Sequence, residues 1–375
     1  MTAKVVAFHL PQFHRIPEND AWWGAGFTEW TNTTKAKPLF PGHYQPRLPK
    51  DNYFYDLTDQ HSREWQSRLA TEYGVSGFCY YHYWFGGKKL LFKPVEALLD
   101  DHRFQIPYCL SWANEPWTRT WTGRGTQVLQ SQVYGGPKDW EAHFQYLLPF
   151  FLDPKYLRIG GAPIFLVYRA GNIPRCREMI QTWRALAKRA GLDDLFICHI
   201  LTSFESQEMN FFDKSVVLEP SFTSIFDVPV SFKLRRYARA FVGRGGRRAF
   251  PRSSIFNSPL FQDRISYDFI WSRICTRPER AVHSAPQRII PGAFVDWDNS
   301  PRRGRNGTMM VGATPEKFER FLRKQIQFAD SYYKSDLLFV NAWNEWAEGA
   351  YLEPDQRWGT GYLNALRAAV ESGDY

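Results

Sequence analysis

Eight short apolar runs alternate along this chain with longer amphipathic stretches, and this alternation limits the possible folds more than any other feature. The apolar runs predict strands over residues 5–9, 77–82, 106–112, 163–168, 195–200, 215–219, 289–295 and 337–342. The amphipathic stretches predict helices over residues 61–73, 93–101, 138–153, 175–190, 262–277, 315–331 and 362–372. Eight strands that alternate with helices favour a (β/α)8 TIM barrel of the α/β class over an open sheet. We therefore predict one domain over residues 1–375, with loop insertions.

The aromatic content points to a surface that binds sugars. Aromatic residues make up 17% of the 375 residues, and 15 of them are tryptophans. Trp and Tyr beyond the needs of a core provide flat rings, on which sugars pack their C–H faces while their hydroxyls bind polar partners. The composition also excludes a disordered or collagen-like chain.

A barrel of this kind places its active site at the carboxyl ends of its strands. Nearly every predicted strand end in this chain carries an aromatic residue together with a hydrogen-bonding or acidic one. Isolated residues of this kind can be structural caps on the barrel rim, but their recurrence at several ends favours a sugar site. The candidate substrate-binding residues are His9, Gln12, Tyr81, His82, Trp112, Asn114, Trp117, Asp296, Trp297, Trp343, Asn344 and Trp346.

The end of the eighth predicted strand supplies the strongest candidates for catalysis. Glu345 and Glu348 lie three residues apart among tryptophans, so a helical turn would place both on one face. Cleavage of a glycosidic bond needs one acid to protonate the leaving oxygen and a second carboxylate as base, nucleophile or charge stabiliser. Glu115, at the third strand end, is a third catalytic candidate. The structural alternative is an Asn–Glu turn that caps the following helix.

Basic residues concentrate in one stretch of a chain whose net charge is +9. Residues 220–262 predict an irregular, Arg-rich insertion after strand six. Its basic side chains are Lys233, Arg235, Arg236, Arg239, Arg244, Arg247, Arg248 and Arg252. Such a stretch can attract an anionic glycan or a membrane surface, or it can be a solvated loop and helix face. We expect no nucleic-acid partner, because neither a base-stacking motif nor a zinc pattern accompanies it.

The remaining motifs predict neither a cofactor nor a metal. His9, Gln12, His14 and His82 are alternative metal ligands, but none of them forms a ligand-spacing motif. No P-loop and no G-x-S-x-G elbow occurs. The five cysteines form no C-x-x-C pair and predict small core residues without disulfides. Neither a leader peptide nor a membrane-spanning run is visible, which predicts a cytoplasmic protein.

Several motifs together resemble one family. They are residues 8–14 (FHLPQFH), 19–24 (NDAWWG), 26–30 (GFTEW), 42–46 (GHYQP), 77–85 (GFCYYHYWF), 112–115 (WANE) and 341–355. The chain resembles WbsX-type proteins, a glycoside hydrolase family 99-like group found in bacterial polysaccharide loci. The resemblance implies a (β/α)8 barrel that acts on a polysaccharide or a lipid-linked glycan.

Residues 344–349 (NEWAEG) resemble the Asn-Glu-Trp-x-Glu-Gly segment of related endo-mannosidases. The resemblance implies that Glu345 acts as base toward a sugar 2-hydroxyl, with an anhydro-sugar intermediate. It implies that Glu348 is the acid/base at the leaving oxygen. Those enzymes often have His at the position of Ala347, so the resemblance does not extend to mannose specificity.

The sequence leaves three functions open. The first is a retaining glycoside hydrolase that uses Glu345 and Glu348 on a polysaccharide or oligosaccharide. The second is a glycosyltransferase or transglycosylase of O-antigen or capsule assembly, for which residues 296–298 (DWD) would supply the metal-binding D-x-D. The third is a glycan-binding barrel without catalytic activity.

Overall fold

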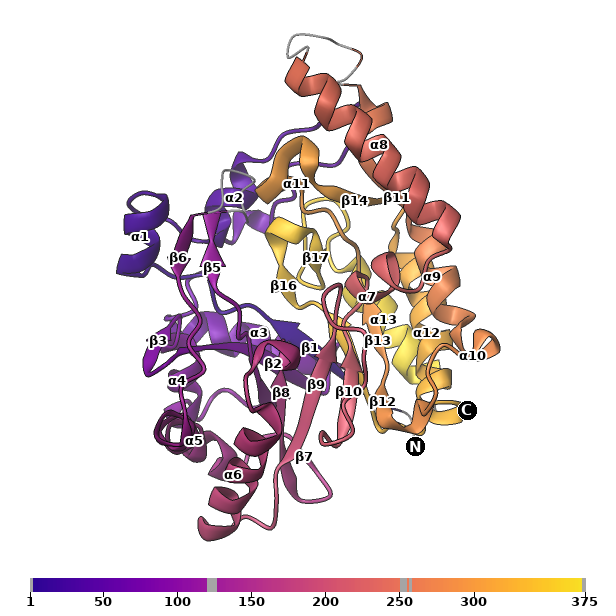
Figure 1. Ribbon diagram of the computed structural model, residues 1–375. Coiled ribbons are helices and arrows are strands. Elements are labelled where there is room, and N and C mark those ends of the chain that lie inside the picture. Colours follow the sequence, from indigo (N-terminus) through magenta and orange to yellow (C-terminus); the bar gives the residue numbers. More distant parts are fainter. Residues whose placement is uncertain (1–2, 120–126, 250–254, 256–257, 373–375) are drawn as a thin grey trace.

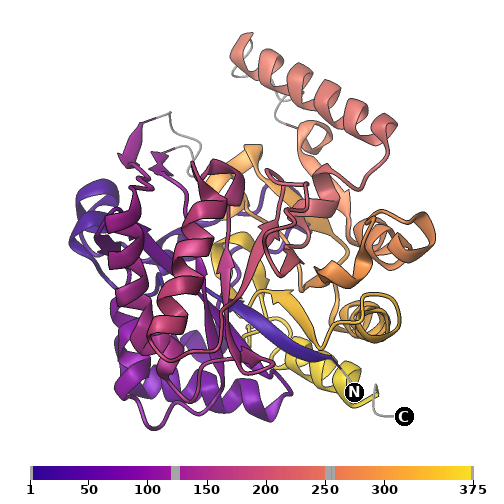
Figure 2. The same cartoon turned by 60° about the horizontal axis from the view of Figure 1, so that its bottom comes forward.

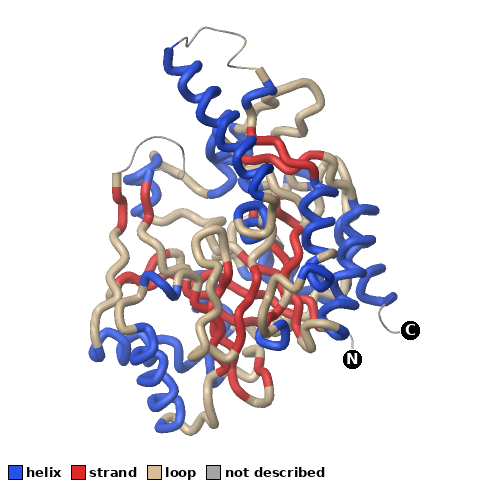
Figure 3. Tube along the Cα trace, turned by 45° about the vertical axis from the view of Figure 1, so that its right-hand side comes forward, coloured by secondary structure: helices blue, strands red, loops and turns tan. Residues whose placement is uncertain are grey.

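The computed structural model describes residues 3–119, 127–249, 255 and 258–372 and shows a parallel barrel surrounded by helices (Figure 1; Figure 3). Each barrel strand pairs with the next in sequence, and β15 returns to pair with β1. The barrel strands are β1 (Lys4–His9), β2 (Gly77–Phe85), β4 (Tyr108–Trp112), β8 (Ala162–Val167), β9 (Phe196–Leu201), β10 (Lys214–Val217), β12 (Ile289–Ile290) with β13 (Gly292–Phe294), and β15 (Leu337–Asn341). The structure confirms the predicted (β/α)8 fold.

The seventh strand is interrupted, and its two halves close the barrel. β12 pairs with β10, whereas β13 pairs with β15. Pro291 lies between the halves and has no N–H to donate to a neighbouring strand, but its carbonyl accepts a hydrogen bond from Phe339 N–H at 3.1 Å. The strand therefore changes partners at the residue that could not continue a regular ladder.

The barrel strands are buried on both faces, as expected where helices cover a parallel sheet. All nine residues of β2 are buried. Parallel registers with Val6 opposite Gly77, and Lys4 opposite Leu337, bring the ends of β1, β2 and β15 to the same side of the barrel. The carboxyl ends of strands far apart in sequence therefore meet around one opening.

Helices cover the outside of the barrel, and each lies within a few residues of its predicted position. They are α3 (Gln60–Glu72), α4 (Lys93–Asp100), α5 (Pro137–Leu152), α6 (Cys176–Arg189), α9 (Tyr267–Cys275), α12 (Pro315–Ser331) and α13 (Gly361–Glu371). α12 shows why the prediction worked. The Thr314 side chain caps its first turn at Lys317 N–H, Pro315 occupies its first position, and Phe318, Leu322 and Ile326 are buried. α12 packs beside α13, which ends close to the start of β1 (Figure 2).

Smaller elements decorate the carboxyl ends of the strands. Two helices, α1 (Pro17–Trp23) and α2 (Glu29–Lys35), follow β1, and α11 (Ser300–Arg303) follows the seventh strand. Three two-stranded ribbons are formed by β5 (Trp117–Thr118) with β6 (Val128–Gln130), β11 (Asp263–Ser266) with β14 (Thr308–Val311), and β16 (Asn344–Glu345) with β17 (Ala350–Tyr351). These elements surround the opening of the barrel and build the walls of the cavity described below.

The prediction of an irregular insertion over residues 220–262 was wrong. The segment contains α7 (Ser221–Ile225) and the 20-residue helix α8 (Val230–Ala249). Apolar residues at spacings of four, three and four, from Val230 to Phe241, give α8 a helical period that its arginines and glycines obscured. Arg252 lies outside the described residues, as do the side chains of Arg244 and Arg247.

The cysteine prediction is confirmed, because all five cysteines are free and buried. Among the helices of the described residues, none is both long and apolar enough to cross a membrane.

Gly292 offers a test of how the barrel closes. A β-carbon on Gly292 would lie 1.9 Å from the Val217 carbonyl oxygen, so the strands would have to separate. Gly292→Ala should lower the free energy of unfolding by about 3 kcal/mol, as overpacking against a rigid backbone does. Urea denaturation followed by circular dichroism measures this change.

Gly245→Ala provides the matched control, because a β-carbon there would meet no atom within 4 Å. In a helix this change should be neutral or stabilising by up to ~1 kcal/mol. Equal stability of the wild type and Gly292→Ala would contradict the close approach of β13 to β10.

Candidate active site

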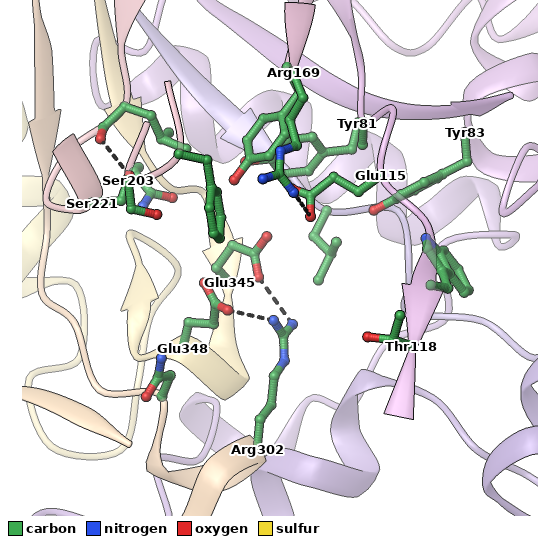
Figure 4. A pocket seen from close by; sticks show the side chains of 18 of the residues that line it. Tyr81, Tyr83, Glu115, Thr118, Arg169, Ser203, Ser221, Arg302, Glu345 and Glu348 are labelled. Atoms are coloured by element: carbon green, nitrogen blue, oxygen red, sulfur yellow. Dashed lines mark hydrogen bonds and ion pairs between the residues drawn. The ribbon is translucent and has the colours of Figure 1, made fainter. Parts of the chain in front are cut away.

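A cavity of about 470 Å³ opens at the carboxyl ends of the barrel strands, within the usual size of a ligand site. Aromatic side chains line much of its wall, among them Tyr81, Tyr83, Trp117, Tyr168, Phe204 and Trp297. Its charged lining residues are Glu115, Arg169, Arg302, Arg303, Glu345 and Glu348. Figure 4 shows Arg302 pointing between Glu345 and Glu348, with Glu115 and Arg169 across the cavity.

A short irregular segment after β15 turns Glu345 and Glu348 toward the cavity. Glu345 ends β16, and the 3₁₀ turn η7 (Trp346–Glu348) follows directly. Gly349 ends this turn with φ of 65°, a conformation that favours glycine. A β-carbon on Gly349 would lie 3.0 Å from both Arg47 Nη1 and Asp298 N, so the close packing also requires glycine. The turn thus fixes the directions of the two glutamates.

Asn344 attaches this segment to the first strand end. Its Oδ1 accepts a hydrogen bond from Leu10 N–H at 2.7 Å, and its Nδ2 donates to the Leu10 carbonyl at 3.1 Å. The same Nδ2 donates to the Tyr55 hydroxyl at 3.3 Å. Asn344 is fully buried, so its role is to position the neighbouring Glu345.

A buried polar network centred on Glu353 supports the turn η7. Glu353 accepts hydrogen bonds from Trp346 Nε1–H at 2.7 Å, the Tyr55 hydroxyl at 2.8 Å and Gln66 Nε2–H at 2.7 Å. The Gln66 oxygen in turn lies 3.0 Å from His9 Nε2. Burial raises the pKa of Glu353 to about 7, although these donors favour its ionised form. The indole N–H of Trp346 is therefore hydrogen-bonded to the Glu353 carboxyl group next to the segment that carries Glu345 and Glu348.

Arg302 binds three carboxylates at once. Its side chain extends from α11 into the cavity wall. Arg302 Nη1 donates to Glu348 at 2.6 Å, and Arg302 Nη2 lies 3.3 Å from Glu345. Its Nε and Nη2 also donate to Glu29 at 3.0 Å and 2.7 Å. The planar fork of a guanidinium suits this arrangement, since it presents several donors in fixed directions.

Arg302 is one cation among three carboxylates, of which Glu29 and Glu345 are buried and Glu348 is partly exposed. Burial, and then repulsion by Glu348, raises the pKa of Glu345 to about 8 against the opposing charge of Arg302. Burial also raises the pKa of Glu29. At neutral pH the raised pKa therefore favours a proton on Glu345, and a carboxyl group with a pKa near neutrality is suited to acid/base chemistry.

Glu115 lies across the cavity beside Arg169. The two charged groups are 3.3 Å apart. Burial raises the pKa of Glu115, and the positive charge of Arg169 opposes this effect. Asn114 holds Arg169 in place, because its Oδ1 accepts from Arg169 N–H at 2.8 Å and its Nδ2 donates to the Arg169 carbonyl at 2.9 Å.

The family model described as "Glycosyltransferase WbsX" matches residues 5–366. The chain belongs to the WbsX family. Two proteins named WxcX, from Xanthomonas campestris pv. campestris strains B100 and ATCC 33913, are each 37% identical to it over 378 residues. These alignments cover 99% of the chain but 50% of each relative, so the chain spans about half the length of these curated relatives.

The fold of this WbsX-family chain is also found in solved glycoside hydrolases. A GH99 endo-α-mannosidase from Bacteroides thetaiotaomicron aligns over 98% of the chain and 96% of its own, with a TM-score of 0.53 and 13% identity. A "glycoside hydrolase-like protein" aligns over 98% and 94%, with a TM-score of 0.57 and 14% identity. At these identities the similarity shows a shared barrel fold.

Among the predicted site residues of this WbsX-family chain, six line the cavity. They are Tyr81, Glu115, Trp117, Trp297, Glu345 and Glu348. Gln12 lines a smaller adjoining hollow of about 40 Å³ that it shares with Trp117, Glu29 and Arg302. The structure thus brings together acids and aromatic rings from the ends of several different strands.

The other predicted binding residues do not line the cavity, which corrects the expectation that they contact substrate directly. His9, Asn344, Trp346 and Asn114 are buried within the supporting contacts described above. Trp343 is fully buried, with its ring 5.0 Å from that of Phe78. Position at a strand end does not determine whether a side chain faces the opening or the surrounding layer.

The remaining three are committed to partners outside the cavity. His82 Nε2 lies 2.8 Å from His143 Nε2, and burial lowers the pKa of His82 to about 3. Trp112 Nε1–H donates to the Trp84 carbonyl at 3.1 Å. Asp296 accepts from Arg47 Nη1–H at 2.7 Å.

The alternative metal site is not assembled. His9 and His82 have the partners just described, and His14 Nδ1 lies 2.9 Å from the Pro11 carbonyl. In the part of the chain that the structure describes, no group of three or more His, Cys, Asp or Glu side chains could hold a metal ion.

Arg302 is the main residue that the sequence reasoning missed. It lies outside the predicted strands and helices, and no motif marks its side chain. The sequence does indicate a short helix at this position, because Asn299, Ser300 and Pro301 form a typical helix start directly after the seventh strand end. A basic residue there faces the eighth strand end only once the barrel has closed.

The raised pKa of Glu345 predicts how stability depends on pH. Its folded pKa of about 8 exceeds the ordinary value of 4.5, so the folded protein holds a proton that the unfolded chain releases. This contribution is fully present below pH 4.5 and is lost as pH rises through about 8. The free energy of unfolding should therefore fall across this window, by up to ~1.4 kcal/mol per pH unit from this group.

Glu345→Gln should make that dependence shallower, because the amide does not titrate. Urea denaturation at several pH values between 5 and 8.5 measures the slopes. Glu141→Gln, at an exposed position of α5, should keep the slope of the wild type. Parallel slopes for the wild type and Glu345→Gln would contradict the proton held at Glu345.

Proposed function

We propose that this protein is a retaining glycoside hydrolase that cleaves a bacterial polysaccharide or oligosaccharide with Glu345 and Glu348. The observation that carries the proposal is the pair of glutamates at the barrel opening, which share one guanidinium and of which the buried Glu345 has a raised pKa. A cavity lined by aromatic rings gives sugar rings flat surfaces beside these acids.

The resemblance to family 99-like enzymes supplies separate roles for the two glutamates. Glu345 removes the proton of the sugar 2-hydroxyl as its oxygen attacks the anomeric carbon, and Glu348 protonates the leaving oxygen. Water then opens the 1,2-anhydro sugar, Glu348 takes a proton from the water, and Glu345 returns one to the 2-oxygen. Two inversions at the anomeric carbon give net retention.

The pKa of Glu345 adds one requirement to this scheme. In the free protein the raised pKa favours the proton on Glu345, whereas the reaction begins with it on Glu348. Both glutamates contact Arg302, so the proton can pass within the pair when a sugar 2-hydroxyl docks beside Glu345. Glu115, paired with Arg169 across the cavity, is a third acid that can bind sugar hydroxyls.

A glycosyltransferase or transglycosylase of O-antigen or capsule assembly is the second candidate, and the description of the family model favours it. Against a nucleotide-sugar transferase stands the state of the D-x-D. Asp296 pairs with Arg47 at 2.7 Å, and Asp298 accepts from Gln45 at 2.7 Å and lies 2.7 Å from His43 Nε2. Neither aspartate is left to bind a metal-nucleotide, whereas transglycosylation would use the same two glutamates as hydrolysis.

Glu345→Gln and Glu348→Gln should each lower activity by at least ~10²-fold, because the amide neither donates nor accepts the transferred proton. A panel of bacterial polysaccharides, with the first-formed product anomer followed by NMR, measures rate and stereochemistry together. Glu141→Gln controls for removal of a charge. Full activity in either site variant, or an inverted product, would exclude the proposed mechanism.

Incubation with nucleotide sugars separates the two candidate functions. The hydrolase releases sugar from a glycan and no nucleotide from a nucleotide sugar. Nucleotide release that Glu345→Gln leaves unchanged would instead support the transferase.

Arg302→Gln should shift the acidic limb of the pH–rate profile to higher pH. The charge of Arg302 lowers the pKa of Glu345, the group that must be ionised, so its loss should raise that pKa by roughly one unit or more. The pH dependence of kcat/KM measures the shift. Arg303→Gln is the matched control, since Arg303 also lines the cavity but no carboxylate of the pair binds it, and its profile should keep the limbs of the wild type. An unmoved acidic limb in Arg302→Gln would contradict the role of Arg302.

A further inference from the structure

Helix α8 exposes an apolar stripe to solvent. The helix projects from the body of the protein in two views (Figure 1; Figure 2). Its exposed fractions are 69% for Val230, 64% for Leu234, 65% for Tyr237 and 81% for Phe241. Spacings of four, three and four residues place these side chains on one face of the helix. Large apolar side chains that are exposed side by side are typical of a surface that binds a protein, a membrane or another ligand.

The opposite face of α8 anchors the helix to the protein. The Phe232 ring lies 4.9 Å from that of Phe269. Arg236 Nε donates to Asp263 at 2.7 Å, and its Nη1 donates to the Ser224 carbonyl at 2.9 Å. Because these contacts fix the inner face, the apolar stripe points outward and is not a misplaced part of the core.

Cations are frequent on the helix that carries the apolar stripe, and the surrounding sequence contains no acid. Between Asp227 and Asp263 there is neither Asp nor Glu, whereas eight residues are Lys or Arg. On α8 the side chains of Arg235, Arg239 and Arg248 are exposed. Leu260, just beyond α8 in the chain, adds another exposed apolar side chain at 70%. The segment therefore combines exposed apolar area with an excess of positive charge.

We propose that α8 docks this protein on the surface of an anionic phospholipid bilayer. An amphipathic helix with an apolar stripe and a cationic polar side lies in the plane of such a surface, with its apolar side chains among the acyl chains and its cations attracted to the phosphates. Long arginine side chains can reach the headgroups while the apolar stripe is buried. A second copy of this chain would bring like charges together, and a nucleic acid would leave the aliphatic side chains without a partner.

The anchoring contacts of α8 link the docking surface to the cavity. Arg236 Nη2 donates to Thr308 Oγ1 at 3.2 Å, and Thr308 N–H donates to Asn299 Oδ1 at 2.8 Å. Asn299 lines the cavity. Docking through α8 would therefore attach the membrane surface to an element that contacts the wall of the cavity. Membrane docking itself does not depend on the proposed hydrolase activity.

Vesicle flotation tests the proposal without any enzyme assay. The full protein should float with vesicles of phosphatidylcholine and phosphatidylglycerol, bind pure phosphatidylcholine vesicles far less, and be partly released by high salt. The triple variant Leu234→Ser, Tyr237→Ser, Phe241→Ser should bind the anionic vesicles at least about tenfold more weakly. Arg235→Gln with Arg239→Gln should weaken binding by about tenfold as well.

Matched controls separate docking from loss of fold. Val128→Ser, Val133→Ser and Leu152→Ser change side chains that are also about half exposed, at 52%, 53% and 53%, and should bind like the wild type. Circular dichroism should show the same unfolding midpoint for the triple variant and this control.

Three results would overturn the proposal. The first is no flotation of the wild type with anionic vesicles. The second is a dimer in sedimentation that the triple variant dissociates, which would assign the stripe to a second copy of the chain. The third is binding to heparin or duplex DNA that the arginine variant loses while the triple variant keeps its vesicle binding, which would indicate a polyanion site.

Discussion

Closure of the barrel through its divided seventh strand is the constraint on which the rest of this structure depends. β12 pairs only with β10 and β13 only with β15, and the strand changes partners at Pro291 and Gly292. A side chain at Gly292 would collide with the backbone of β10, so the closing strands approach as near as glycine allows. Once the ring is closed, eight strand ends converge on one opening, and residues hundreds of positions apart become neighbours.

Burial and a shortage of positive charge around Arg302 set the electrostatics of the cavity. One guanidinium contacts Glu29, Glu345 and Glu348, and burial, followed by repulsion from Glu348, raises the pKa of Glu345. A carboxylic acid that stays protonated near neutral pH is suited to proton transfer, whereas a surface glutamate is not. Arg302 keeps the acids together, while burial and their mutual repulsion favour a proton on Glu345.

Much of the polar chemistry near the barrel opening positions other groups. Asn344 joins the segment of Glu345 and Glu348 to the first strand end, Asn114 holds the backbone of Arg169, and Glu353 holds the indole of Trp346. Each of these side chains is buried and satisfies donors or acceptors that would otherwise be costly. Such supports look like binding residues in a sequence, because they are polar and lie at strand ends.

The sequence by itself determined the eight strands, the main helices around them and the location of the glutamates, because periodicity and local apolar runs fix these features within a short window. It also marked Tyr81, Trp117 and Trp297, whose rings line the cavity. Only the tertiary structure decided which strand-end side chains face the opening, because the direction of each side chain depends on neighbours that are distant in sequence. His82 and Trp112, for example, point into the layer outside the opening. The same holds for Arg302, which meets Glu29 and Glu348 only when segments far apart in the chain fold against one another. Local pattern fixes the elements, and long-range packing fixes which charges share a site.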